Sequence, residues 1–383
     1  MTLRILNVND MLDLKSGGGT ADRTFQMSRS LARQGAHCTV LTIDSEHLDA
    51  KRIEELKPAK VFVLARLMKR FHVPQWNWKL IADAVNNTDV IHLMGHWSVL
   101  NALVYLAARR TKKPYVVCPA GALPLFGRSK LLKYFYNLIV GKAIIRNASG
   151  WIAVTKSEFP QFVKYGVGSS QITVIPNGVS EEDFPFDDIA AFKLRHGLPD
   201  VPIILFMGRL APIKGPDLLL KAFIQSRHTF PAYHLVFVGP DGGMLAGLRE
   251  MVVRAGISEL VHFLGYIGGI DKSSAYRMAS LLVIPSRQEA MSIVAIEAGI
   301  CGVPVLLTDQ CGLSEIRSID ARLEVNASVD GIANGLASLL TGSENLEKVA
   351  LAWHSFVARN YAWTSLTKEY FRLYENILAA KSR

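Results

Sequence analysis

The sequence predicts an α/β protein with two doubly wound parallel sheets, and three observations support this class. Short apolar, β-branched runs alternate with helical patterns along the 383 residues. The apolar runs are continuous, as in parallel strands that helices cover on both faces. The alternation starts again after a segment rich in Pro, Gly and Asp at 176–202. A chain of this length exceeds the size at which a single core stops growing, so we expect two domains.

The strand candidates divide between the two halves of the chain. In the first half they lie at 3–8, 38–43, 61–65, 90–94, 115–119, 151–154 and 172–176, separated by helical stretches such as 24–35 and 98–110. In the second half they lie at 203–208, 234–239, 261–265, 281–285 and 303–308. After residue 328 the pattern is helical and ends in SLTKEYFRLYENIL (365–378), whose apolar residues at helical spacing need a surface to cover.

Composition and charge narrow the class of partner. The 43 Lys and Arg exceed the 33 Asp and Glu, which gives a formal net charge of +10. This charge favours an anionic partner, either a membrane surface or a phosphate-bearing substrate. We expect no nucleic-acid partner, because the chain carries no helix-turn-helix, zinc or RNA-binding signature.

The cysteines and the apolar runs indicate a cytoplasmic location. Cys38, Cys118, Cys301 and Cys311 form no CxxC pair and lie on or beside apolar segments, which predicts buried free thiols in a reducing compartment. The apolar run of MTLRILNVND is too short for a signal peptide, and no stretch approaches the ~18 apolar residues that span a bilayer.

In open α/β sheets ligands bind beyond the carboxyl ends of the strands, and two loops there carry candidate anion-binding groups. Gly17, Gly18 and Gly19 follow the first strand, with Thr20 as a candidate N-cap of the next helix. Bare backbone at a helix N-terminus suits an anion, but these glycines alone could equally form a flexible turn. The spacing is not GxGxxG, so a nicotinamide site is poorly supported. Arg209 and Lys214 flank the turn after the first strand of the second half, where they could bind one phosphate group or simply face solvent.

The stretch PSRQEAMSIVAIEAGICGVPVLL (285–307) carries two glutamates around a short helix. Glu289 ends the loop after a strand, and Glu297 lies about two helical turns further on. Ser292 is a candidate N-cap between them. Glu289 could accept hydrogen bonds from sugar hydroxyls and Glu297 from a ribose, whereas each alone is more often a solvated or salt-bridged side chain.

Four segments together resemble the retaining GT-B glycosyltransferases of family 4. They are the three glycines after the first strand, GRLAPIKGPDLLLKAF (208–223), the stretch 285–306 with its E-x7-E spacing, and the late aromatic helix from residue 361. The first half, through VIHLMGHWSVLNALVYLAARRTKKPYVVCPAGAL (90–123), also resembles members that assemble polysaccharides and lipid-linked saccharides.

The resemblance implies a fold and a domain plan. It implies two Rossmann-like domains that face a cleft, with the C-terminal helix crossing back to the first. The acceptor-binding domain would comprise residues 1–178 with the helix 360–383, and the donor-binding domain residues 179–359.

The resemblance also implies residue roles. Arg209 and Lys214 would hold the donor diphosphate, Glu289 would bind the donor sugar, and Glu297 the ribose. Other donor contacts would come from Gly18, Gly19, Tyr266, Ile267, Ala290, Met291 and Ser292, and acceptor contacts from His96, Trp97 and Arg128. The reaction would retain the anomeric configuration and need neither a metal nor another cofactor, consistent with the lack of a DxD motif or His/Cys cluster.

The sequence departs from the family pattern at two places. Ala290, Met291 and Ser292 replace the usual G-F-G, which narrows the donor pocket, and Ala120 stands where His or Arg is common. His96 could compensate, or it could be a buried structural histidine.

We therefore expect transfer of a hexose from a nucleotide-sugar, with a UDP-hexose such as UDP-glucose slightly favoured, to a saccharide acceptor. The alternatives are a non-catalytic subunit that binds nucleotide-sugar or supports a transferase, and a sugar phosphorylase, for which no residue marks a pyridoxal phosphate lysine.

The segment FGRSKLLKYFYNLIVGKAIIR (126–146) predicts a membrane contact. It mixes large apolar residues with five cations and no acid, which suits a helix at an anionic interface. A lipid-linked acceptor and a peripheral position at the inner face of the membrane would follow. The alternative is a core helix whose cations face solvent.

Overall fold

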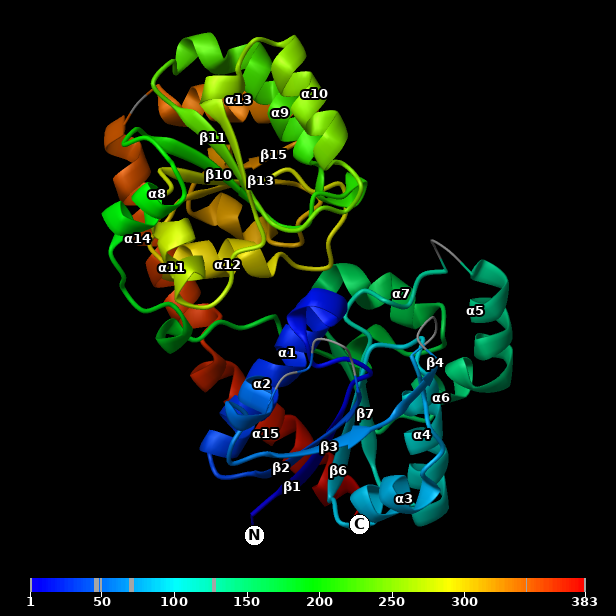
Figure 1. Cartoon of the computed structure of the whole chain (residues 1–383). Coiled ribbons are helices and arrows are strands. Elements are labelled where there is room, and N and C mark those ends of the chain that lie inside the picture. The colour runs from blue at the N-terminus through cyan, green and yellow to red at the C-terminus, as the bar shows by residue number, and fades with distance from the viewer. Residues whose placement is uncertain are drawn as a thin grey trace. The chain divides into compact units, whose positions relative to one another are not determined.

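A computed structural model of the chain describes residues 2–44, 48, 50–68, 72–125, 129–341 and 343–381. The chain divides into two compact units, Met1–Gly178 with Trp363–Arg383, and Val179–Ala362. Each unit is built on one parallel sheet with helices on both faces (Figure 1). The predicted fold class, two doubly wound parallel-sheet domains, is confirmed.

The first unit contains a seven-stranded sheet in the order β3-β2-β1-β6-β7-β8-β9, with every neighbouring pair parallel. Its strands are β1 (Arg4–Val8), β2 (His37–Ile43), β3 (Lys60–Leu64), β6 (Val90–Met94), β7 (Tyr115–Cys118), β8 (Gly150–Ala153) and β9 (Ile172–Val174). A short antiparallel hairpin, β4 (Arg66–Met68) and β5 (Val73–Pro74), was not predicted from the sequence. The chain order reverses between β1 and β6, so the switch point of this sheet lies there.

Helices cover both faces of this sheet. They are α1 (Leu14–Arg33), α2 (Ala50–Glu54), α3 (Trp78–Asn86), α4 (Val99–Thr111), α5 (Lys130–Tyr136), the π-helical turn η1 (Asn137–Gly141), α6 (Lys142–Arg146), α7 (Phe159–Val163) and α15 (Trp363–Lys381). Figure 1 shows α1 and α15 on one face and α3 and α4 on the other.

Helix α1 differs from the prediction at its start. It begins at Leu14 and bends at Gly18, whose φ of 55° and ψ of −140° are not helical. Thr20 therefore lies inside α1, and its hydroxyl donates to the carbonyl of Gly17 at 3.0 Å. The predicted N-cap role of Thr20 was wrong, because the chain turns helical before the glycines.

The C-terminal helix α15 belongs to the first unit and is fastened there by buried polar contacts. Arg23 of α1 donates to the Tyr370 hydroxyl at 2.6 Å and to the Ile175 carbonyl at 2.7 Å. The ring of His92 on β6 lies 2.7 Å, through Nδ1, from the Tyr374 hydroxyl. The apolar face predicted for this helix covers α1 and the sheet.

The second unit contains a six-stranded parallel sheet in the order β12-β11-β10-β13-β14-β15. Its strands are β10 (Ile203–Met207), β11 (His234–Val238), β12 (Val261–Gly265), β13 (Leu281–Ile284), β14 (Val305–Thr308) and β15 (Glu324–Val325), the last not predicted. Its helices are α8 (Ile189–Arg195), α9 (Pro216–Ser226), α10 (Leu245–Arg254), α11 (Ile270–Arg277), α12 (Ile293–Ile300), α13 (Val329–Leu340) and α14 (Ser343–Asn360). The chain order reverses between β10 and β13, which places the switch point there.

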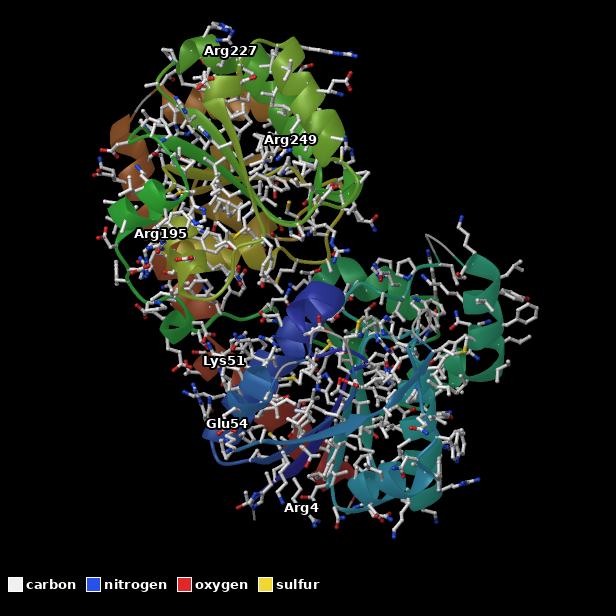
Figure 2. All side chains as sticks on the ribbon, viewed as in Figure 1. Arg4, Lys51, Glu54, Arg195, Arg227 and Arg249 are labelled. Carbon is white, nitrogen blue, oxygen red and sulfur yellow. The ribbon has the colours of Figure 1, made fainter. Side chains whose placement is uncertain are left out.

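Burial follows the sequence pattern in both units. The residues of β13 and β14 are buried throughout, as expected for continuous apolar strands covered on both faces. The four cysteines are buried and free. Labelled charged side chains such as Arg195, Arg227 and Arg249 project from the outer elements of the second unit (Figure 2).

Candidate active site

The candidate site of the second unit lies at its switch point, where β10 and β13 are neighbours. The loop after β10 carries Arg209 and Lys214, and the loop after β13 carries Glu289. Both loops leave the carboxyl edge of the sheet. Residues that are 75 positions apart in sequence are thus brought together at the edge where doubly wound sheets bind ligands.

The two loops approach each other so closely that one position requires glycine. Gly215 has a φ of 67°, and a Cβ built on it would lie 2.0 Å from the carbonyl oxygen of Pro285. The amide of Arg287 donates to the carbonyl of Ile213 at 2.8 Å. These contacts fix the distance between the loops, and therefore between Lys214 and Glu289.

Lys214 and Glu289 form an ion pair, with 2.9 Å between Nζ and Oε1. The Glu289 side chain is only 9% exposed and that of Lys214 is 34% exposed. The Ser286 hydroxyl also donates to Oε1 of Glu289. The second oxygen of Glu289, Oε2, has no hydrogen-bond partner among the described residues, so this carboxylate can accept from a ligand hydroxyl.

A second ion pair, which sequence reasoning missed, braces the same loops. Both terminal nitrogens of Arg287 donate to Asp217 in the first turn of α9, at 2.9 and 2.7 Å. The Arg287 guanidinium holds the pKa of Asp217 below its usual value despite partial burial, which acts in the opposite direction. The one sequence feature that indicates the Arg287–Asp217 ion pair is an acidic residue, Asp217, in the first turn of α9.

The start of α12 differs in part from the prediction. Ser292 occupies the N-cap position, but its hydroxyl makes no capping bond and has no hydrogen-bond partner in the described part of the chain. Its amide donates to the Cys311 carbonyl at 3.0 Å. The loop after β14 thus holds this amide in the structure, and the contact of Ser292 with the donor stays a prediction.

The two other residues that replace the family glycine motif are packed against the protein. Met291 is buried at 5% exposure. The carbonyl of Ala290 lies so close to Gly312 that a Cβ there would be 2.0 Å away. The loop after β14 thus supports the loop that carries Glu289.

Glu297 lies inside α12 and is almost fully buried. Its Oε1 forms an ion pair with Lys272 at 2.6 Å, and its Oε2 accepts from the Tyr276 hydroxyl at 2.5 Å. Both partners come from α11, at positions that no sequence pattern marks. The two contacts orient the carboxylate and leave each oxygen with capacity for one more hydrogen bond.

The remaining predicted donor residues of this unit lie at the same edge of the sheet. Arg209 is exposed, and its Cγ would be 2.9 Å from a Cβ built on Gly242, so its stem lies over the loop after β11. Tyr266 and Ile267 follow β12, with Tyr266 half-exposed. Gly18 and Gly19 belong to the first unit, at the bend of α1, and their contact with a donor stays a prediction.

The predicted acceptor residues follow β6 in the first unit. His96 is buried, its Nε2 lies 3.0 Å from Oδ1 of Asn137, and burial lowers its pKa to about 4. The rings of Trp97, Tyr136 and Tyr165 surround it, which is the environment of a neutral structural histidine. Trp97 is half-buried, and its indole N–H donates to the Ala122 carbonyl at 2.5 Å. Arg128 lies outside the described residues.

Asp10 is a residue at this edge that sequence reasoning missed. It follows β1, next to the loop after β6, and its carboxylate accepts from the Ser98 hydroxyl. Burial raises the pKa of Asp10 to about 7. Ala120, where a polar residue was expected, has a φ of 49°, an uncommon value for a residue other than glycine. The switch point of the first unit therefore combines a perturbed carboxyl group with a strained loop.

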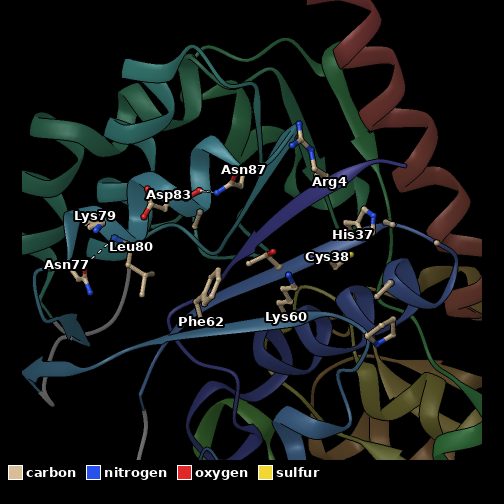
Figure 3. A pocket seen from close by; sticks show the side chains of 16 residues that line it. Arg4, His37, Cys38, Lys60, Phe62, Asn77, Lys79, Leu80, Asp83 and Asn87 are labelled. Atoms are coloured by element: carbon tan, nitrogen blue, oxygen red, sulfur yellow. Dashed lines mark hydrogen bonds between the residues drawn. The ribbon is translucent and has the colours of Figure 1, made fainter. Parts of the chain in front are cut away.

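A cavity of about 870 Å³ lies elsewhere in the first unit (Figure 3). Arg4, His37 and Lys60, which line it, are the first residues of β1, β2 and β3. The cavity thus lies at the amino ends of these strands, opposite to the edge where such sheets bind ligands. We do not assign it to the candidate active site.

Two family models match the chain. The model Glycosyltransferase Family 4 matches residues 17–183, and the model Glycosyl transferases group 1 matches residues 189–351. Each match falls on one of the two doubly wound units. The chain belongs to the family 4 glycosyltransferases, which have the GT-B fold.

Curated relatives and solved structures agree with this family. A D-inositol 3-phosphate glycosyltransferase of Streptomyces scabiei is 37% identical over 191 residues, 46% of this chain and 42% of that protein. One of Frankia alni is 27% identical over 336 residues, 77% of this chain and 79% of that protein. The match thus spans less than half the length of the Streptomyces relative. The crystal structure of HepE from Anabaena with UDP and glucose is similar in fold, with a TM-score of 0.76 at 18% identity, covering 98% of this chain and 100% of that chain.

Proposed function

We propose that the chain transfers a hexose from a nucleotide-sugar to a saccharide acceptor with retention of anomeric configuration. The observation that carries this proposal is the Lys214–Glu289 ion pair at the switch point of the second unit, with Glu297 held on the next helix. A cation and a carboxylate at one point match the two halves of a donor, its charged diphosphate and its hydroxyl-bearing sugar.

Arg209 and Lys214 would bind the diphosphate and stabilise the charge that grows on it as the glycosidic bond to phosphate breaks. Glu289 would accept hydrogen bonds from the sugar through Oε2, next to the backbone of Ala290 and Met291. Glu297 would accept from the ribose, and the backbone at Tyr266 and Ile267 would meet the base. Gly18 and Gly19 would contribute backbone to the donor site.

The proposed step conserves atoms and charge without a metal or another cofactor. The bond between the anomeric carbon and the leaving phosphate oxygen breaks, and the acceptor oxygen forms its bond on the same face. The acceptor proton goes to a phosphate oxygen of the leaving nucleoside diphosphate. The protein contributes positive charge and orientation rather than a nucleophile.

A UDP-hexose such as UDP-glucose is the donor that we favour, and the solved structure of HepE with UDP and glucose supports testing it first. We place acceptor binding in the first unit, residues 1–178 with the C-terminal helix, around Trp97 and the His96 loop. The proposed acceptor is a lipid-linked saccharide in polysaccharide biosynthesis, reached from the cytoplasmic face of a membrane.

The experiment that tests this function follows UDP release from UDP-hexoses by the purified full chain, with and without saccharide acceptors. We expect release above the uncatalysed rate for at least one UDP-hexose, and loss of that release in Glu289→Gln. The alternative, a non-catalytic subunit, predicts that nucleotide-sugar binds and is not consumed. Binding by calorimetry with no turnover for any UDP-hexose would therefore replace the transferase proposal.

A further inference from the structure

The positive charge of the chain is concentrated in one part of the first unit. The 68 residues from Val90 to Ser157 contain ten Lys and Arg and no Asp or Glu. The remaining residues contain 33 Lys and Arg and 33 Asp and Glu, and they are therefore balanced. The whole net charge of +10 thus comes from this stretch, which includes the helical segment α5, η1 and α6.

This helical segment exposes a continuous set of large apolar side chains, which we term the α5 surface. Each of the six residues is between 52% and 78% exposed: Leu131, Leu132, Tyr134, Phe135, Leu138 and Ile139. Scattered exposed apolar residues are normal on a soluble protein, but six within nine positions form a patch that marks an interaction site. Side chains of α5 project outward from the first unit in Figure 2.

The opposite side of the same segment is firmly attached to the unit. The Tyr136 hydroxyl donates to the Ser98 carbonyl at 2.8 Å. The Asn137 amide donates to the Tyr165 hydroxyl at 2.8 Å, and its oxygen faces His96. Gly141 is needed at the π-helical turn, since a Cβ there would lie 2.5 Å from the Asn137 oxygen. The exposed face is therefore held in place and is not a frayed helix end.

We propose that the α5 surface binds the surface of an anionic lipid bilayer. The apolar residues would enter the boundary between headgroups and acyl chains, and the exposed Lys130 and Lys142 would contact anionic headgroups. The lack of any acidic residue from Val90 to Ser157 removes repulsion by the same headgroups. Among the described residues no helix is long and apolar enough to cross a membrane, so contact would be through this surface.

This surface also lies next to the residues that we assign to the acceptor. Tyr136 and Asn137 contact Ser98 and His96, which follow β6 at the carboxyl edge of the sheet. Docking of α5 would therefore hold that edge of the first unit beside the bilayer. Binding of lipid by the α5 surface does not depend on transferase activity and is tested without it.

Sedimentation with lipid vesicles tests the proposal on the full chain. We expect binding to vesicles of phosphatidylcholine with phosphatidylglycerol at low salt, and at least ~10-fold weaker binding to phosphatidylcholine alone or at high salt. The variant Leu131→Ser/Leu138→Ser/Ile139→Ser removes three of the most exposed apolar side chains, and Lys130→Glu/Lys142→Glu reverses two charges. Each should reduce the partition coefficient at least ~10-fold.

Matched controls separate this surface from general effects. Leu194, Val253 and Leu351 are 83%, 69% and 69% exposed in the second unit, and their triple Ser variant should bind as the wild type does. Lys348→Glu/Lys368→Glu changes the net charge equally at exposed positions and should have less than a ~3-fold effect. Thermal unfolding should be unchanged in all four variants, because the replaced side chains are exposed.

Three results would overturn the proposal. The first is absence of binding to anionic vesicles at low salt. The second is equal binding by the α5 variants and their controls. The third is a dimer of the wild type in analytical ultracentrifugation that becomes a monomer in the apolar variant, with no binding to vesicles. In that case a second copy of the chain would occupy the α5 surface.

Discussion

Replacing Lys214 by methionine removes the ammonium group from the candidate site while keeping an unbranched side chain that is one atom shorter. The Nζ atom lies 2.9 Å from Oε1 of Glu289 and still has N–H groups for a diphosphate. Loss of one preorganised charge contact to a transition state costs about 3 kcal/mol, so kcat should fall ~100-fold or more. Nucleotide affinity should fall less, because the charge on the leaving group grows during the reaction.

The same change should have a measurable but smaller effect on stability. Glu289 is 9% exposed, and without Lys214 it keeps only the Ser286 hydroxyl among the partners described here. An inadequately paired buried carboxylate costs about 1–3 kcal/mol. The double variant Lys214→Met/Glu289→Gln should recover most of that loss in urea unfolding, but no activity.

The assay measures kcat/KM for release of UDP from the UDP-hexose that the wild type uses best. Lys348→Met, at an exposed position on α14, is the control and should change kcat/KM by less than ~2-fold. A kcat/KM for Lys214→Met within twofold of the wild type would refute the role of this residue.

Further predictions follow from other contacts. Gly215→Ala should lower the free energy of unfolding by more than ~2 kcal/mol and reduce activity, whereas Gly197→Ala, with a similar φ of 63° and open space, should cost only ~1 kcal/mol in the same urea titrations. Glu297→Gln should weaken UDP binding in calorimetry at least ~10-fold, and unchanged affinity would remove its ribose role. The pKa of buried His92 is lowered from 6.5 to about 3, so its contribution to stability is complete above pH 6.5 and is lost as the pH falls, which unfolding between pH 7 and 5 should show. The pKa of Asp10 is raised from 3.8 to about 7, so its contribution to folding stability is complete below pH 3.8 and is lost as the pH rises through 7. Asp10→Asn should therefore stabilise the fold at pH 8 by up to ~4 kcal/mol and have little effect near pH 4.

Most of the fold could be predicted because the apolar runs are long and uninterrupted. Strands such as β6 and β12 were predicted with their observed bounds, since continuous β-branched runs report burial on both faces. The start of α1 could not be predicted, because three glycines normally end a helix and here only Gly18 leaves helical geometry. The short β15 depends on pairing with β14, which is a tertiary contact with little local signal.

The loops that carry the candidate site residues could be predicted from the sequence, but the side chains that hydrogen-bond to those residues could not. Arg209, Lys214 and Glu289 follow strands, and parallel topology brings such positions to one edge of a sheet. The partners of Glu297 lie on α11, at positions that carry no pattern in the sequence. Asp10 was also hidden, because its raised pKa arises from burial against the loop after β6.

We propose that the chain moves a hexose with retention by means of two cations and two carboxylates. Proton NMR of the purified chain with a UDP-α-hexose and a saccharide acceptor tests it most directly, with chelator present and with Glu289→Gln as the matched variant. We expect UDP release together with a new α-linked anomeric signal, both unaffected by chelator and both lost in the variant. A β-linked product, or consumption of the donor that persists in Glu289→Gln, would contradict it.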